Sequence, residues 1–382
     1  MKVFVDARSI ATTATGVFPQ GGVGRYLYQL LLQYEHLAPE LELTLIVRAA
    51  NRRPILEREG VSEVRCTYPA NSWRGLFWMA RQIDLRKADL YHSPHNILPF
   101  GVPCPAVTTV HDVMWFTHPK LCSRFFLDRI TKGPLYRVGI RRALKESAHL
   151  LTVSEASRGE IERIAPNVTG RITVTHHGVD PSFRAIPPEQ VSSNLPGLVP
   201  PGTAFVFTIG AGSPHKNQAR AIRAFHRAFA DRPEIKLVLV RRFRRVDIEL
   251  SRLLATPAIR RQIILLPHIT EDQLRALYSG ARMLFFPSLM EGFGMPILEA
   301  MACGTPVLTS NCGAMLEVSA SAALQVDPYA VDDIAAGLRR LQDDEALRAR
   351  LIAAGQRRIQ DFSWQRSAER TLAVYRSVIG GR

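Results

Sequence analysis

The chain has 382 residues, of which 46% are hydrophobic and 22% charged, a composition that excludes a disordered or fibrous protein. Because single domains rarely exceed about 250–300 residues, this length predicts two domains. The net charge of +15 favours an anionic partner, which could be a nucleotide, a nucleic acid or an anionic lipid surface.

The sequence predicts a cytoplasmic protein without disulfides. It has no run of about 18 apolar residues that would cross a membrane, and Asp6 and Arg8 interrupt the N-terminal apolar run, unlike in a signal peptide. The five cysteines include no Cys-x-x-Cys pair, so neither a disulfide framework nor a zinc site is expected.

Short apolar runs alternate with helical patterns along the whole chain. The runs are apolar nearly throughout rather than alternating, which is typical of strands buried on both faces of a parallel sheet. Strand–helix alternation of this kind predicts right-handed βαβ units and doubly wound sheets. Strands are expected at 3–7, 43–47, 89–92, 106–111, 150–154 and 172–176, and then at 204–210, 235–240, 263–267, 283–287, 306–310 and 324–327.

One proline-rich segment interrupts this alternation. Pro187-Pro188, Pro196-Gly197 and Pro200-Pro201-Gly202 follow one another closely, and prolines at this density do not continue a helix or a central strand. We therefore predict an N-terminal domain at 1–185, a linker at 186–202 and a C-terminal domain at 203–363. Tandem open sheets of this class present their strand C-termini to a shared cleft, where ligands usually bind.

Two segments of the first half are candidate ligand contacts. A glycine cluster around Gly22 precedes an apolar helix and would cradle a phosphate with its backbone amides, although a plain surface loop explains it equally well. His111 and Asp112 end a predicted strand, where polar side chains face the ligand crevice. A structural hydrogen-bonding role for His111 remains the alternative.

A basic stripe is predicted on the helix between the strands near residues 110 and 150. Arg137, Arg141 and Lys145 follow one another at a spacing of four residues. Such a stripe can lie on an anionic membrane surface, or it can be the solvated face of a helix that covers the core. The spacing alone leaves both alternatives open.

In the second half, a glycine turn and a glycine loop each follow a predicted strand. Lys216 comes just after Gly210-Ala-Gly and would offer a point charge to a diphosphate, although a solvated lysine at a helix start is the simpler alternative. Glu291 precedes a helix that we expect to begin near Met295, and Glu299 lies about one turn into it. Carboxylates so placed can accept hydrogen bonds from sugar or ribose hydroxyls, or they can simply cap the helix.

The complete string Glu-Gly-Phe-Gly-Met-Pro-Ile-Leu-Glu at 291–299, continued by Ala-Met-Ala-Cys-Gly-Thr-Pro-Val, resembles the signature of the retaining glycosyltransferases of family 4. Members of this family have the GT-B fold, in which two Rossmann-like doubly wound parallel-sheet domains face a cleft. The resemblance extends from Val3 to about Tyr375. It implies that the residues at 364–382 form a helix that crosses back to the first domain.

The resemblance also implies roles for individual residues. Glu291 and His111 would contact the transferred sugar, and Glu299 would bind the ribose hydroxyls of the donor. Lys216 would bind the β-phosphate, and His215 stands where the family usually has arginine, so Arg241 or its neighbour Arg242 is a candidate for the missing charge. The glycine turn at Gly22 would line the donor diphosphate, and the separate glycine-rich loop of Gly292, Phe293 and Gly294 would contact the sugar and the diphosphate.

The expected activity is hexosyl transfer from a nucleotide-sugar to a saccharide, in surface polysaccharide or glycoconjugate synthesis. The resemblance implies retention through reaction at one face of the sugar, with the leaving phosphate accepting the acceptor proton. No Asp-x-Asp occurs in the cleft segments, so neither a metal nor a cofactor is expected. Residues 111–119, His-Asp-Val-Met-Trp-Phe-Thr-His-Pro, resemble bacterial polysaccharide mannosyltransferases, which favours GDP-mannose as donor.

The sequence leaves alternatives for the donor, the type of enzyme and the acceptor. UDP-glucose or a UDP-N-acetylhexosamine is the alternative donor, and a nucleotide-sugar epimerase of the same fold is the alternative enzyme. A polyprenyl-diphosphate-linked acceptor would place the protein peripherally on the inner face of the cell membrane. No nucleic-acid partner is expected, because the basic residues are dispersed and no recognition module is visible.

Overall fold

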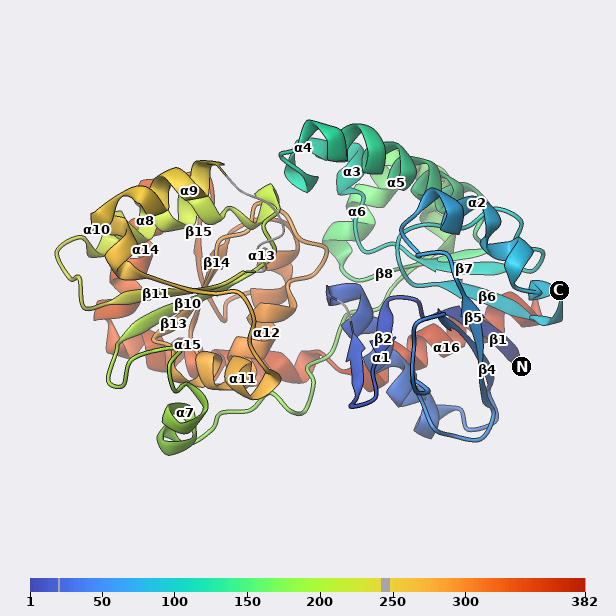
Figure 1. The fold of residues 1–382 in the computed structure, drawn as a ribbon, viewed down its shortest axis with the longest axis horizontal. Coiled ribbons are helices and arrows are strands. Elements are labelled where there is room, and N and C mark those ends of the chain that lie inside the picture. Colours follow the sequence, from blue (N-terminus) through green and yellow to red (C-terminus); the bar gives the residue numbers. More distant parts are fainter. Residues whose placement is uncertain (20, 242–247, 382) are drawn as a thin grey trace. The chain divides into compact units, whose positions relative to one another are not determined.

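The computed structural model describes residues 1–19, 21–241 and 248–381, which form two compact units (Figure 1). The first unit comprises Met1–Gly178 together with Ser363–Arg382, and the second comprises Val179–Phe362. Each unit is built around one parallel sheet.

The first unit contains a seven-stranded sheet in the order β5-β4-β1-β6-β7-β8-β9, with every neighbouring pair parallel. The central strands β1, β6 and β7 are buried on both faces, which explains why their sequences do not alternate between apolar and exposed polar residues. The strands are β1 (Lys2–Asp6), β4 (Glu42–Arg48), β5 (Val61–Cys66), β6 (Leu90–Ser93), β7 (Ala106–Thr109), β8 (His149–Thr152) and β9 (Ile172–Val174), and a separate hairpin pairs β2 (Ile10–Thr12) with β3 (Val17–Pro19).

Helices cover both faces of this sheet. Side chains of α2, α5 and α6 share one core cluster with the sheet, and α1 packs against α16 on the opposite face (Figure 1). The helices are α1 (Gly21–Leu37), α2 (Trp73–Gln82), α3 (Met114–Thr117), α4 (Pro119–Cys122), α5 (Phe126–Glu146), α6 (Glu155–Ile164) and α16 (Trp364–Gly380). The C-terminal helix is thus part of the first unit, where Tyr375 Oη contacts His92 Nδ1 at 2.6 Å.

The second unit contains a six-stranded parallel sheet in the order β12-β11-β10-β13-β14-β15. Its strands are β10 (Phe205–Ile209), β11 (Lys236–Val240), β12 (Ile263–Leu266), β13 (Met283–Phe286), β14 (Val307–Ser310) and β15 (Leu324–Val326). Its helices are α7 (Pro188–Asn194), α8 (Gln218–Phe229), α9 (Ile248–Ala255), α10 (Pro257–Gln262), α11 (Glu271–Gly280), α12 (Met295–Ala302), α13 (Gly313–Ser319), α14 (Val331–Asp343) and α15 (Glu345–Arg358). Helices α8 and α14 pack together over one face, and α11 and α12 lie on the other (Figure 1).

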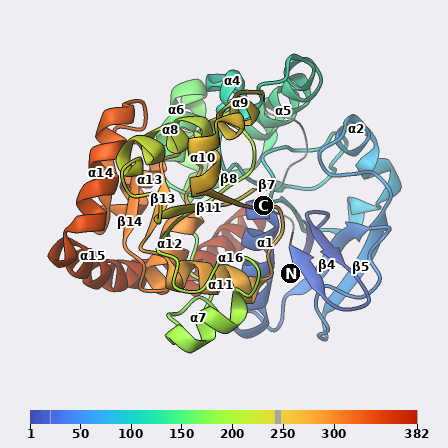
Figure 2. The same ribbon diagram turned by 60° about the vertical axis from the view of Figure 1, so that its left-hand side comes forward.

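The two doubly wound parallel sheets confirm the predicted fold class, and each predicted strand is present within a few residues of its expected position. The proline-rich segment at 186–202 differs from a plain linker because it contains α7. This helix begins at Pro188, where a proline is tolerated in the first turn, and it lies beside α11 in both views (Figures 1 and 2). Within the described ranges, we find no helix with the length and hydropathy to cross a bilayer.

Candidate functional site

The glycine turn after β10 brings together two basic side chains of the second unit. Lys216 packs its aliphatic stem on Gly210, where an added Cβ would lie 3.1 Å from the lysine Cδ. Arg241 directly follows β11 and packs on Gly212, where a Cβ would lie 2.5 Å from Nη2 of its guanidinium. Only 3% of Arg241 is exposed, so this cation is held within the fold beside the turn. Arg242 lies outside the described residues.

The loop between β13 and α12 carries the predicted glutamates. Gly294 precedes the helix with φ 104°, a conformation that a residue with a Cβ rarely adopts, so glycine is required at this position. The helix then begins at Met295, as expected, and the amides of its first turn point back towards the loop. Glu299 lies in this helix and is 8% exposed.

The structure pairs Lys216 with Glu291. Lys216 Nζ donates to Glu291 Oε1 at 2.7 Å, and the two side chains are only 16% and 12% exposed. Burial alone would raise the pKa of Glu291, but the charges of Lys216 and His215 and hydrogen bonds from Lys216 and Ser288 more than offset it. The pKa of Glu291 therefore lies below its ordinary value, and the residue is a carboxylate at neutral pH.

Three neighbours hold these groups in place, and the sequence patterns did not identify their roles. Tyr278 Oη donates to Glu299 Oε2 at 2.7 Å, which orients the buried carboxylate. The amide of Asn217 donates to the carbonyls of Pro287 and Pro328, at 3.0 and 2.8 Å, and so ties the Lys216 turn to two further loops. The backbone carbonyl of His215 accepts from Leu289 N at 2.7 Å and joins the same turn to the loop after β13.

His111 occupies the carboxyl end of the β7 segment in the first unit. Its Nε2 contacts the carbonyl of Pro94 at 2.8 Å, and because a carbonyl only accepts, Nε2 carries the proton. Burial lowers the pKa of His111 to about 4, although the hydrogen bond to Pro94 acts in the opposite direction. The imidazole is therefore neutral at physiological pH, with Nδ1 as its unprotonated nitrogen.

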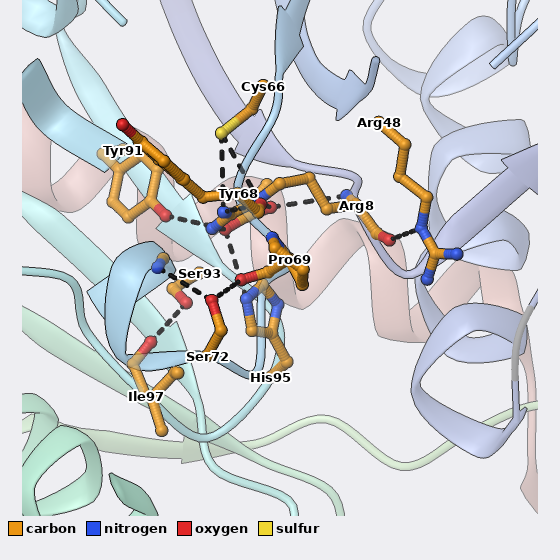
Figure 3. A network of polar contacts seen from close by, with 12 residues as sticks. Arg8, Arg48, Cys66, Tyr68, Pro69, Ser72, Tyr91, Ser93, His95 and Ile97 are labelled. Atoms are coloured by element: carbon orange, nitrogen blue, oxygen red, sulfur yellow. Dashed lines mark hydrogen bonds and ion pairs between the residues drawn. The ribbon is translucent and has the colours of Figure 1, made fainter. Parts of the chain in front are cut away.

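A buried polar network beside His111 organises the loops that follow β5 and β6 (Figure 3). Arg8 Nε donates to Asp6 Oδ1 at 2.7 Å, Arg8 Nη1 donates to the carbonyl of Tyr68 at 2.8 Å, and His95 Nε2 lies 3.2 Å from Asp6 Oδ2. Burial would raise the pKa of Asp6, but Arg8 and His95 hold it well below its ordinary value. This network fixes the loop that contains Pro94, the hydrogen-bond acceptor of His111.

Gly22 and Phe293 are two further residues that were predicted to contact the donor. The helix α1 begins at Gly21 rather than after the glycine cluster, so Gly22 lies in the first helical turn, where amides lack intrahelical partners. Phe293 is 3% exposed and its ring packs edge-to-face on Phe362, with centroids 5.7 Å apart. The ring is therefore committed to the core, which leaves only the backbone of Phe293 for a ligand.

The basic stripe lies on the outward face of α5. Arg137, Arg141 and Lys145 are all exposed, whereas Ile140 and Leu144 of the same helix are buried. This placement is compatible with both predicted alternatives. In the part of the chain that the structure describes, three or more His, Cys, Asp or Glu side chains nowhere gather as a metal site would require.

Comparison with protein families assigns both halves of the chain. Residues 20–183 match the family described as Glycosyltransferase Family 4, and residues 196–358 match the family described as Glycosyl transferases group 1. Together the two matches include the glycine cluster, His111, the Lys216 turn and both glutamates.

Individual relatives agree with these matches. The chain is 28% identical to O-antigen chain mannosyltransferase B of Escherichia coli, over 94% of this chain and 97% of the relative. It is 31% identical to the MMP alpha-(1→4)-mannosyltransferase of Mycolicibacterium hassiacum, over 63% of this chain and 56% of the relative. Among solved structures, HepE of Anabaena in complex with UDP and glucose has the same fold, with a TM-score of 0.74 at 19% identity over 98% of this chain and 99% of that one.

Proposed function

The chain belongs to glycosyltransferase family 4 and has the GT-B fold, and we propose that it transfers mannose from GDP-mannose to a saccharide acceptor with retention of configuration. The observation that carries the proposal is the Lys216–Glu291 pair, because it brings the cation that would bind phosphate within 2.7 Å of the carboxylate that would bind the sugar. Mannose is favoured because two relatives that match this chain are named mannosyltransferases.

The donor diphosphate would bind at the glycine turn after β10. Lys216 and Arg241 both pack on this turn, so two cations converge where backbone amides can also approach an anion. As the bond between the sugar and the diphosphate breaks, negative charge grows on the leaving phosphate, and these fixed charges would stabilise it. The same two cations would make a bridging metal ion unnecessary, and the reaction would need no cofactor.

The carboxylates would orient the sugar and the nucleoside. Glu299, held by Tyr278, would accept hydrogen bonds from the ribose hydroxyls, and Glu291 would accept from hydroxyls of the transferred sugar. His111 is neutral, so it would contact the sugar through a hydrogen bond rather than as a charge. Its unprotonated Nδ1 is an acceptor that suits a sugar hydroxyl.

The proposed chemistry is a displacement on one face of the sugar. The bond between the anomeric carbon and the β-phosphate oxygen breaks, and the acceptor oxygen bonds to the anomeric carbon from the same side. The acceptor proton passes to the leaving phosphate, so no side chain acts as a covalent nucleophile. A lipid-linked acceptor would bring the protein to a membrane surface, where Arg137, Arg141 and Lys145 would meet anionic headgroups.

Thermal unfolding with a panel of nucleotides tests the donor assignment. A ligand at a hundredfold its dissociation constant adds about 2.7 kcal/mol of stability, which corresponds to roughly 5–10 °C for a domain of this size. We expect GDP-mannose and GDP to stabilise the protein more than UDP-glucose, UDP-N-acetylglucosamine and UDP. Stabilisation by the uridine nucleotides alone would reject GDP-mannose as the donor.

A further inference from the structure

The outward face of α5 changes character along the helix. Its N-terminal end exposes three large apolar side chains, with Phe126 68%, Leu127 61% and Ile130 50% exposed. About two turns further along the helix, the same outward face carries the basic stripe. Single exposed apolar residues are common, but three on adjacent turns of one helix indicate an interaction surface.

The basic stripe keeps its charge because the acids of α5 pair with other residues. Asp128 contacts Lys132 at 3.2 Å, and Glu146 contacts Arg142 at 2.7 Å. Arg137 Nε donates to the carbonyl of Trp115 at 3.0 Å, which holds the guanidinium without neutralising it, so the stripe presents its positive charge to an external anionic partner.

The neighbouring helix α2 exposes a similar combination of side chains. Trp73, Phe77 and Trp78 are 40–42% exposed, and the exposed Arg74 and Arg81 lie among them. The sequence of α2 contains no acidic residue. Aromatic and basic side chains together are typical of elements that lie at the interface between lipid and water.

The two helices present their exposed faces on the same side of the sheet. Both bury side chains in one core cluster, through Met79 of α2 and Ile140 of α5, and they pack against each other (Figure 1). A column of side chains also connects them: Phe77 stacks on Phe100 with ring centroids 4.8 Å apart, and the guanidinium of Arg142 lies 4.2 Å from the Phe100 ring centroid. The outward faces of α2 and α5, which we call the α2–α5 surface, are thus continuous.

The geometry points to the α2–α5 surface as a docking site for an anionic lipid bilayer. In this arrangement Phe126, Leu127 and Ile130 insert among the lipid chains, and the basic stripe lies on the headgroups. A bilayer fits better than a soluble polysaccharide, because a neutral saccharide would leave both the cations and the branched aliphatic side chains without a complementary partner. The inference deepens the proposed membrane-bound acceptor, and it adds an apolar insertion that the basic stripe alone does not provide.

Flotation with vesicles, without any nucleotide, tests this docking site directly. The probes are vesicles of phosphatidylcholine with about one-third phosphatidylglycerol and vesicles of phosphatidylcholine alone, each at physiological salt and at high salt. One variant removes the apolar tip, a second removes the basic stripe, and a matched control replaces exposed apolar residues of the second unit, Ile248 and Leu316, which are 65% and 44% exposed. The variants are F126S/L127S/I130S, R137Q/R141Q/K145Q and I248S/L316S.

The tip variant and the stripe variant should differ in how salt affects their binding to vesicles. The wild-type protein should bind the anionic vesicles at physiological salt and keep part of this binding at high salt. The tip variant should bind at least about tenfold more weakly and lose the salt-resistant part, because its apolar side chains are gone. The stripe variant should lose roughly a hundredfold, about fivefold for each basic residue, together with the preference for phosphatidylglycerol. The control should bind as the wild type does.

A depth measurement and an activity measurement complete the test. Phe126→Trp in a W73F/W78F background should be quenched by brominated acyl chains. Transfer to a soluble saccharide should be unchanged in the tip variant, so failure of the donor proposal and failure of docking give different results. The proposal is overturned if the wild-type protein ignores both kinds of vesicle, if the tip variant binds as tightly as the wild type, or if the tip variant instead loses binding to a soluble mannan.

Discussion

Replacing Lys216 by methionine separates phosphate binding from the rest of donor recognition. The ammonium at the glycine turn is proposed to address the diphosphate and not the nucleoside. A hydrogen bond to a charged group contributes about 1.5–3 kcal/mol, so Lys216→Met should weaken GDP binding by roughly 10- to 150-fold. Guanosine, which has no phosphate, should bind the variant as it binds the wild type.

The same substitution removes the partner of a mostly buried carboxylate, and this second effect must be controlled. Without Lys216, burial should raise the pKa of Glu291, so the variant should be least stable at neutral pH. Because protonation removes the unpaired charge, the deficit should shrink as the pH falls towards about 4. The double variant K216M/E291Q should recover stability at neutral pH without recovering GDP affinity.

Calorimetric titration of GDP and guanosine into these variants gives the answer. Lys87→Met makes the same chemical change at an exposed position of the first unit and should leave both affinities unaltered. Equal losses for GDP and guanosine in the Lys216 variant would show that the effect is structural. Full GDP affinity in K216M/E291Q would remove Lys216 from the phosphate site.

Three further predictions address the ribose contact, the metal and the buried histidine. Glu299→Gln should weaken GDP binding by about tenfold but leave 2′,3′-dideoxy-GDP binding nearly unchanged, since the hydroxyls that Glu299 would bind are missing; an equal loss for both ligands in the same titration would contradict the ribose assignment. Initial transfer rates should be the same with and without EDTA, and an activity that EDTA abolishes and Mn²⁺ or Mg²⁺ restores would reject the metal-independent mechanism. The pKa of His111 is lowered to about 4, so its neutral form stabilises the folded state above about pH 6.5 and this contribution is lost as the pH falls towards 4. His111→Gln should therefore reduce the slope of unfolding free energy against pH by about 1.4 kcal/mol per pH unit across that window, and a denaturant series with an unchanged slope would show that His111 does not titrate this way.

The sequence predicted the sheets well because most of their strands are buried on both faces. Such strands are continuous apolar runs, for example β13, where all four residues are buried. The edge strand β5 was missed because one side faces solvent, which admits Glu63 and Arg65 and breaks the apolar run. The short hairpin of β2 and β3 was also missed, because each of its strands has only three residues.

The candidate site could be predicted only as far as local motifs extend. The family string singled out Glu291 and Glu299 because it is long and contiguous, and Lys216 was singled out by a separate glycine turn after a predicted strand. Their mutual arrangement depends on contacts between residues far apart in the chain, as between Lys216 and Glu291 or Tyr278 and Glu299. The role of Arg8 also depends on distant residues. Its pair with Asp6 becomes part of a buried network only because loops from other strands pack around it. Polar residues at the ends of the adjacent strands β1 and β6 were the one available signal for that network.

Analysis of the reaction product tests whether the protein transfers mannose from GDP-mannose with retention of configuration. The protein would be incubated with GDP-mannose labelled at the anomeric carbon and a mannose-terminated oligosaccharide, offered both free and linked to polyprenyl diphosphate. NMR of the purified product reports which sugar has moved and the configuration of the new linkage. We expect an α-mannoside, which keeps the configuration of the donor. A β-mannoside, or transfer from UDP-glucose without any transfer from GDP-mannose, would contradict retaining mannosyl transfer.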